Sequence, residues 1–226
     1  MNLRSFEIHV TDNDMNDCDD PARSRPYRQT TRADAAEATA RRIVDAFGEC
    51  MHSRWFDELT LEEVAHRAGV AARTVIRRFG GKEGLLKAFA EDFIPAVGAS
   101  RATPPGDVEA AIARLVEVYE AWGDGVFRNL AHEERHPALT PLLDRGRSAH
   151  RAITEANFAP WLDRLAEPDR RRTLDALVAA TDVYAWKLAR RDMGRSREET
   201  AILLRRLVDA VLAQASALAS AAGSRR

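Results

Sequence analysis

Two short stretches of the sequence contain residue types that could do chemistry. The first, residues 132–136, reads HEERH and fits the H-E-x-x-H spacing. On a helix this spacing places two imidazoles on one face, where they can bind a zinc ion beside a glutamate that acts as general base. The stretch therefore raises the hypothesis of a zinc hydrolase or a metal-responsive sensor that uses His132, Glu133 and His136.

The residues after this motif argue against a zinc enzyme. Pro137 follows His136 directly, and a proline favours an extended conformation in the residue before it, so the helical turn that both ligands need is not favoured. No further histidine follows at the spacing of the longer zinc-protease motif, and no catalytic Ser/His/Asp or Cys/His grouping is recognisable. We therefore interpret the motif as a polar helix end, and we expect no metal site, no cofactor and no enzymatic activity.

The second stretch is a basic run from Arg67 to Lys82. It holds five basic residues and no acidic one, although the formal net charge of the whole chain is −1. Such a local excess of positive charge is what phosphate binding requires. At about 100° per residue, one face of a short helix over 72–79 would carry the polar side chains and the opposite face the apolar ones, with Ile76 near the boundary. The polar face consists of Arg73, Thr74, Arg77 and Arg78.

The elements around the basic run predict a helix-turn-helix. Thr60 and Glu63 form a capping box, so a helix should begin at Leu61, and Gly69 should end it. The helix over 72–79 follows after a very short turn and is ended by two glycines. A helix with an exposed basic face can enter the major groove of DNA, where arginine donates two hydrogen bonds to guanine.

Residues 43–86 resemble the N-terminal domain of the TetR family of bacterial transcriptional regulators. The resemblance is carried by IVDA, FDELTLEEVAHRAGV, TVIRRF and GGKEGLL, which follow one another in the family's order. It implies an all-helical homodimer, usually a repressor that leaves its double-stranded DNA operator when a small-molecule effector binds the C-terminal body. The DNA-facing positions that it implies, together with Arg77 of the basic face, are Thr60, Arg73, Thr74, Ile76, Arg77, Arg78 and Lys82.

Three positions depart from the family's pattern. Ala71 stands where a serine commonly caps the recognition helix, so the helix lacks an N-cap hydrogen bond that would stabilise it by about 1 kcal/mol. Ile76 stands where a tyrosine is common, and Trp55 replaces the glycine that usually closes the first helix. These departures bear on the operator sequence and on a helix end, and they leave the DNA-binding expectation in place.

Composition supports a folded, intracellular protein. Hydrophobic residues make up 45% of the 226 residues and charged residues 31%, as in ordinary globular domains. Cys18 and Cys50 are far apart, which argues against a disulfide framework and fits a reducing cytoplasm, and Cys50 is expected to be a small buried residue. No run of 18 apolar residues and no apolar leader occurs, so we expect a cytoplasmic bacterial protein without a membrane span.

Helical periodicity without strand alternation predicts an all-α fold. We expect an N-terminal helix-turn-helix domain of three helices, followed by a larger helical ligand-binding and dimerisation domain. The expected divisions are a disordered arm over 1–33, the DNA-binding domain over 34–81 and the helical body over 82–226. Expected helices cover 34–52, 82–94 (ending before Pro95), 107–130, 138–165 with a possible break near Pro160, 169–192 and 196–220.

Two functional surfaces are expected in the helical body. Helical bundles bind small molecules between apolar walls, although each aromatic residue taken alone is more often part of the core. The candidate wall residues are Tyr119, Trp122, Phe127, Phe158, Trp161 and Tyr184. Apolar stripes on the last two helices predict a two-fold dimer interface that would set two recognition helices against a palindromic operator. The candidate interface residues are Leu177, Thr181, Leu188, Leu207, Val211 and Ala215.

Overall fold

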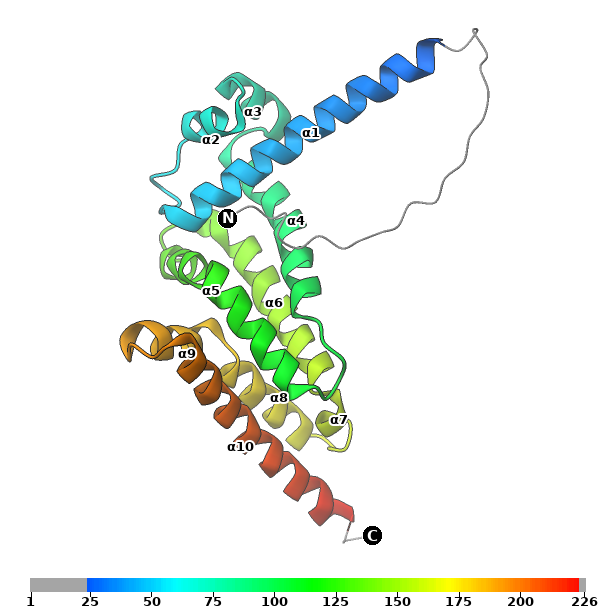
Figure 1. The fold of residues 1–226 in the computed structure, drawn as a ribbon, viewed down its shortest axis with the longest axis vertical. Helices are drawn as coiled ribbons and strands as arrows, with labels where there is room; N and C mark the ends of the chain where they lie inside the picture. Colours follow the sequence, from blue (N-terminus) through cyan, green and yellow to red (C-terminus); the bar gives the residue numbers. More distant parts are fainter. Residues whose placement is uncertain (1–23, 224–226) are drawn as a thin grey trace. The chain divides into compact units, whose positions relative to one another are not determined.

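The computed structural model describes residues 24–223, and all regular structure within this range is helical (Figure 1). This confirms the expected all-α fold with an N-terminal helix-turn-helix. The chain forms two compact units, which divide after Phe89. No helix in the described part is long and apolar enough to cross a membrane.

The N-terminal unit is built from three helices and the first turns of a fourth. They are α1 (Ser24–Ser53), α2 (Leu61–Ala68), α3 (Ala72–Phe79) and α4 (Lys82–Arg101). One side of α1 is apolar and buried, with Ile43 and Phe47 fully inside, and Cys50 is buried as expected. Burial also raises the pKa of the Cys50 thiol. The ring of Phe89 on α4 meets Phe47 edge-on at 5.8 Å between centroids, which is why the first turns of α4 belong to this unit.

The first helix is longer than expected. It begins at Ser24 and not near Asp34, so residues 24–33 are helical and do not belong to a disordered arm. Pro26 lies in the first helical turn, where its missing N–H costs no hydrogen bond, and so it does not interrupt the helix. Residues 1–23 of the expected arm lie outside the described residues.

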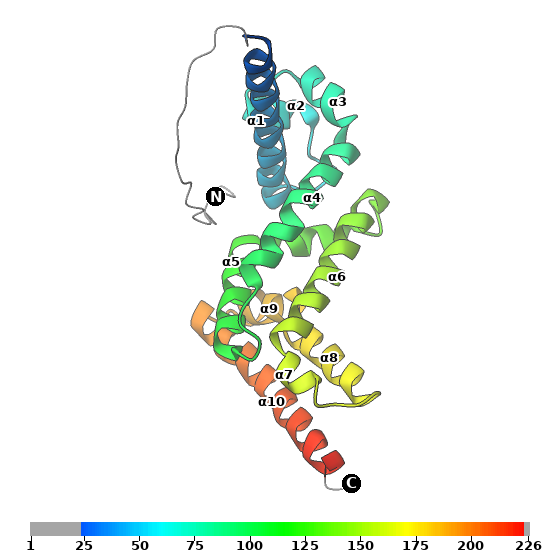
Figure 2. The same cartoon turned by 90° about the vertical axis from the view of Figure 1, so that its right-hand side faces the viewer.

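The C-terminal unit is a bundle around one hydrophobic core (Figure 2). The ring of Trp186 is fully buried at its centre and fits against Gly123, where a β-carbon would lie only 2.4 Å from the indole. After α4, the helices in order are α5 (Val108–His132), η2 (Pro137–Leu139), α6 (Thr140–Asn157), α7 (Ala159–Leu162), α8 (Asp169–Ala180), α9 (Val183–Lys187), the π-helical turn η3 (Leu188–Asp192) and α10 (Arg197–Gly223).

Two expected helix boundaries in this unit are wrong. The helix that was expected to stop before Pro95 continues to Arg101. Its last turns are held by Val97, which packs against the core, and by Arg101, which is itself buried, so packing outweighs the lost hydrogen bond. The helix expected over 169–192 breaks at Thr181 and Asp182, because the Asp182 carboxylate accepts a hydrogen bond from the Tyr184 amide at 3.0 Å and starts α9.

Other boundaries agree with expectation. The expected break near Pro160 lies at Phe158, between α6 and α7. At the start of α10, Ser196 and Glu199 form a capping box with hydrogen bonds in both directions. The Ser196 amide donates to Glu199 Oε2 at 2.8 Å, and the Glu199 amide donates to Ser196 Oγ at 3.1 Å.

Candidate nucleic-acid interface

Helix α2 is fixed at both ends by local signals. Thr60 has an extended backbone, and its hydroxyl accepts a hydrogen bond from the Glu63 amide at 3.2 Å. The Glu63 carboxylate pairs with Arg54 and Arg67, at 3.2 Å from each. At the other end Gly69 adopts φ +66°, a conformation that glycine reaches without strain, and the chain turns sharply into α3.

Helix α3 presents one polar side and packs the other. Val75 is completely buried and anchors the helix, while Ala72 and Phe79 are half-buried beside it. Arg73 and Arg77 are exposed on the opposite side. The division of the helix into a packed face and a polar face is therefore the one that the sequence periodicity predicts.

Three further residues complete the surface of α3. Thr74 is half-buried and Arg78 exposed, whereas the side chain of Ile76 is 50% exposed, which is unusual for a large apolar residue in this chain. Ala71 occupies the N-cap position with an extended backbone and provides no side-chain hydrogen bond, as its residue type requires. The Thr74 amide donates a hydrogen bond of 2.8 Å to the Ala71 carbonyl, which closes the first turn of the helix.

The five basic residues of the run differ in how their charges are used. The Arg67 guanidinium is occupied by Glu63 at 3.2 Å and Glu49 at 4.0 Å. Arg78 pairs with Glu37 of α1 at 3.5 Å, a contact that the sequence analysis missed because the two residues are remote in the chain. In the described part of the chain, Arg73 and Arg77 join no ion pair, so their guanidinium groups are the ones most available to a nucleic acid.

Lys82 lies at the first turn of α4. Its Nζ sits over the ring of Phe56 at 4.3 Å from the centroid, and burial lowers the pKa of its ammonium group. The ring thus holds the lysine in one orientation near the N-terminus of α4. Helix N-termini favour anions, so this end of the helix suits a phosphate.

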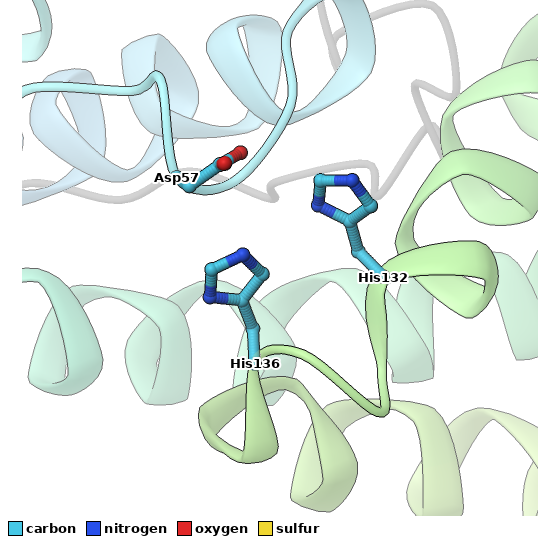
Figure 3. A group of neighbouring side chains, drawn as sticks. All are labelled: Asp57, His132 and His136. Carbon is cyan, nitrogen blue, oxygen red and sulfur yellow. The ribbon is translucent and has the colours of Figure 1, made fainter.

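The residues of the H-E-x-x-H motif do not form the helical arrangement that zinc hydrolysis needs. His132 is the last residue of α5, but His136 has φ −129° and ψ 80° and lies on the following turn (Figure 3). The two imidazole centroids are 5.2 Å apart. Both oxygens of Glu133 accept hydrogen bonds from Arg147, at 2.7 and 3.0 Å, which lowers the pKa of Glu133 and occupies the proposed general base.

The aromatic residues expected to line a pocket do not share one environment. Phe158 and Tyr119 belong to the core, and the Tyr119 hydroxyl donates to the Thr181 carbonyl at 3.1 Å. Trp161 is half-buried against the same core, whereas Trp122 packs edge-on against Phe93. The remaining pair, Phe127 and Tyr184, are in edge-on contact at 5.6 Å, with Tyr184 54% exposed.

The residues expected at the dimer interface fall into a buried group and a group that is at least partly exposed. Leu177, Thr181 and Ala215 are buried within the chain itself and offer no exposed surface to a second copy, which corrects the expectation for these three. Leu177 of α8 belongs to the core of this unit, the Thr181 hydroxyl at the end of α8 donates to the Leu177 carbonyl at 2.8 Å, and Ala215 of α10 is only 1% exposed. Val211 is half-buried against that core, and Leu188 and Leu207 are 53% and 44% exposed.

Comparison with known proteins identifies relatives of this chain. Residues 43–89 match the family model described as bacterial regulatory proteins, tetR family. Over 172 residues the chain is 26% identical to the HTH-type transcriptional regulator AlkX of Mycobacterium tuberculosis, covering 75% of this chain and 76% of that protein. It is 31% identical over 97 residues to an HTH-type transcriptional regulator of Mycobacterium bovis, covering 42% of this chain and 51% of that protein.

A solved structure shares the fold. It is a crystal structure assigned to a TetR-family transcriptional regulator from Mesorhizobium loti, with a TM-score of 0.53 and 18% sequence identity. The similarity covers 79% of this chain and 96% of that one. The matched family segment contains α2, α3 and the start of α4, which are the elements that carry the candidate interface.

Proposed function

Because this chain belongs to the TetR family of bacterial regulatory proteins and is a DNA-binding transcriptional regulator, we propose that it is a repressor with a palindromic operator. A small molecule bound by the helical body releases the repressor from that operator. The observation that carries the proposal is the polar face of α3, where Arg73 and Arg77 are exposed and join no ion pair among the described residues.

The side chains of α3 and its neighbours suit distinct parts of a duplex. The guanidinium of Arg73 can donate two hydrogen bonds to one guanine in the major groove. The exposed Ile76 side chain offers an apolar contact to a thymine methyl group, which is the kind of contact that a tyrosine hydroxyl would not make. Lys82 and Thr60 stand at helix N-termini and suit phosphate contacts, which position the protein without selecting a sequence.

Exposed apolar residues of the C-terminal unit support a homodimer. Among the described residues, five of the seven large hydrophobic side chains that are exposed lie between residues 184 and 207. A monomer seldom leaves such a concentration of apolar surface in water, and a second copy would cover it. The five residues are Tyr184, Leu188, Met193, Ile202 and Leu207.

Helix α4 offers a physical link between ligand and DNA. It is one continuous helix that begins at Lys82, beside the candidate interface, and ends at Arg101 in the C-terminal unit. A ligand that displaces the end of this helix therefore acts on the element that carries Lys82. Release requires only that the ligand bind the displaced state more tightly than the DNA-bound state.

Selection of bound duplexes from a random pool tests the proposal. The wild type is expected to enrich a palindrome whose half-sites are about one helical turn apart or a multiple of that. The double variant Arg73→Ala with Arg77→Ala serves as the control and should enrich nothing. Enrichment of a single half-site would contradict the dimer, and equal enrichment by the control variant would contradict the assignment of α3.

A further inference from the structure

A buried arginine in the C-terminal unit has no carboxylate partner. Arg101 ends α4 and is 7% exposed, yet within the range 24–223 it joins no ion pair. Burial of a positively charged guanidinium without a counter-ion is costly, because the charge loses its hydration and gains no opposite charge in exchange. Such a residue is retained at a cost to stability unless an anion completes its environment.

The neighbouring histidine does not supply that anion. Arg101 Nη1 lies 3.1 Å from His150 Nδ1, and because a guanidinium can only donate, Nδ1 must be the unprotonated nitrogen. The proton is then on Nε2, which donates to the Val178 carbonyl at 3.2 Å. Burial, together with the positive charge of Arg101, lowers the pKa of His150 and keeps the ring neutral.

The acid nearest to this histidine is already engaged elsewhere. One Asp182 oxygen lies 3.9 Å from His150 Nε2, on the side of the ring that faces away from the arginine contact. The other oxygen caps α9 through the Tyr184 amide. Asp182 therefore faces the neutral imidazole and leaves the Arg101 guanidinium uncompensated.

A buried polar face on α6 surrounds the end of α4. His150, Thr154 and Asn157 recur at helical spacing and are all buried. Asn157 Nδ2 donates to the Arg101 carbonyl at 3.3 Å, so residues on both sides of Thr154 contact Arg101. The Thr154 side chain is 2% exposed, and its hydroxyl has no hydrogen-bond partner among the described residues. Thr154 lies on α6 between the two residues that contact Arg101, so one anion could both accept a hydrogen bond from its hydroxyl and supply the counter-ion that the guanidinium lacks.

We infer that the effector of this regulator is a small organic carboxylate, which pairs with Arg101 and accepts a hydrogen bond from the Thr154 hydroxyl. The inference rests on the proposed function and gives the chemical class of the ligand. The ring of Tyr119 lies 5.7 Å from the guanidinium, measured from the ring centroid to Cζ, so an aromatic ring covers one side of the charge. The Tyr119 hydroxyl is already used by the Thr181 carbonyl, so the ring is held in place.

The test uses carboxylates matched with their methyl esters. Hexanoate, octanoate, decanoate, benzoate and phenylacetate are added to the full-length protein at constant ionic strength, with the five esters as neutral controls. At least one carboxylate should raise the melting temperature and release the selected operator in a fluorescence anisotropy assay, whereas its ester should do neither. If none of the carboxylates binds, or if the esters bind equally well, the inference is wrong.

Variants place the binding at Arg101. Arg101→Met removes the charge with little change in length and should weaken carboxylate binding roughly ten- to a hundredfold, the range expected for a lost hydrogen bond to a charged group. Arg114→Met removes an exposed arginine that pairs with Glu117 and should leave carboxylate binding unchanged. Thr154→Val keeps the shape of its side chain and should weaken binding several-fold, so the inference remains testable if the Arg101 variant does not fold. Unchanged carboxylate affinity in either site variant would overturn it.

The proposed function and the proposed carboxylate site can be refuted independently of each other. A wild type that selects an operator but ignores every carboxylate retains the proposed function and loses this inference. A wild type that selects no operator loses the proposed function, while a carboxylate-specific rise in melting temperature that depends on Arg101 would still establish the anion site.

Discussion

Truncation of Arg73 tests the candidate interface most directly. The side chain is exposed and α3 is anchored by Val75 on its other face, so Arg73→Ala should leave the fold intact. A bidentate arginine–guanine contact contributes about 1 to 3 kcal/mol to discrimination, which corresponds to roughly a five- to a hundredfold loss of operator affinity per subunit. Arg67→Ala is the matched control, because Glu63 and Glu49 already pair with that guanidinium. The operator-binding free energy of this variant should weaken by at most about 0.5 kcal/mol.

Fluorescence anisotropy with two duplexes measures both effects. The selected operator and a scrambled duplex are titrated from about 50 to 200 mM salt, a range over which each phosphate contact changes the logarithmic salt slope by about 0.9. Arg73→Ala should weaken the operator far more than the scrambled duplex. If Arg73→Ala lowered the affinity for both duplexes equally and made the salt slope shallower, Arg73 would contact phosphate. If it lowered the operator affinity no more than Arg67→Ala does, the assignment of the basic face would be refuted.

Three further substitutions, one of them with a control variant, test the cap of α3, the core of the C-terminal unit and the proposed dimer interface. Ala71→Ser should supply the missing N-cap of α3 and raise stability by about 1 kcal/mol, or roughly 2 to 4 °C in melting temperature, and a lower value in calorimetry would show that the cap geometry is wrong. Gly123→Ala should cost about 1 to 3 kcal/mol, because its β-carbon would meet Trp186 at 2.4 Å. In the control Gly98→Ala, the added β-carbon would have no neighbour closer than 3.8 Å. This control should raise the free energy of unfolding, measured by urea denaturation, by up to about 1 kcal/mol. Leu207→Glu should convert dimers to monomers in light scattering, and dimers that persist would place the interface elsewhere.

The N-terminal unit could be predicted closely because its signals are local. A threonine cap, an αL glycine and a pair of glycines after α3 each act within one helical turn, and the bounds of α2 and α3 are those expected. The start of α1 could not be predicted from the same rules. Its first turns contain a proline and charged residues that resemble a linker in composition, although they lie in a position where a helix tolerates both.

The C-terminal unit could be predicted only in part because distant contacts decide its details. Pro95 signals a helix end, but Val97 and Arg101 are held by residues far away in the sequence, and the helix continues. The apolar stripe on α10 has the same ambiguity. Leu207 and Ala215 both belong to a helix that is apolar around much of its circumference, and only the fold shows that Ala215 is buried while Leu207 is exposed.

In a helical bundle, aromatic residues are a weak indication of a ligand site. Periodicity assigns apolar positions to the interior and polar positions to solvent, so it gives no signal for a buried polar face such as that of His150, Thr154 and Asn157. The structure buries that face and places it around Arg101, while two of the aromatic candidates, Phe158 and Tyr119, serve mainly as core. Buried polar groups are costly unless they are satisfied, so an unpaired guanidinium and an unsatisfied hydroxyl are a more specific indication of a missing ligand than an apolar wall, which packs equally well against itself.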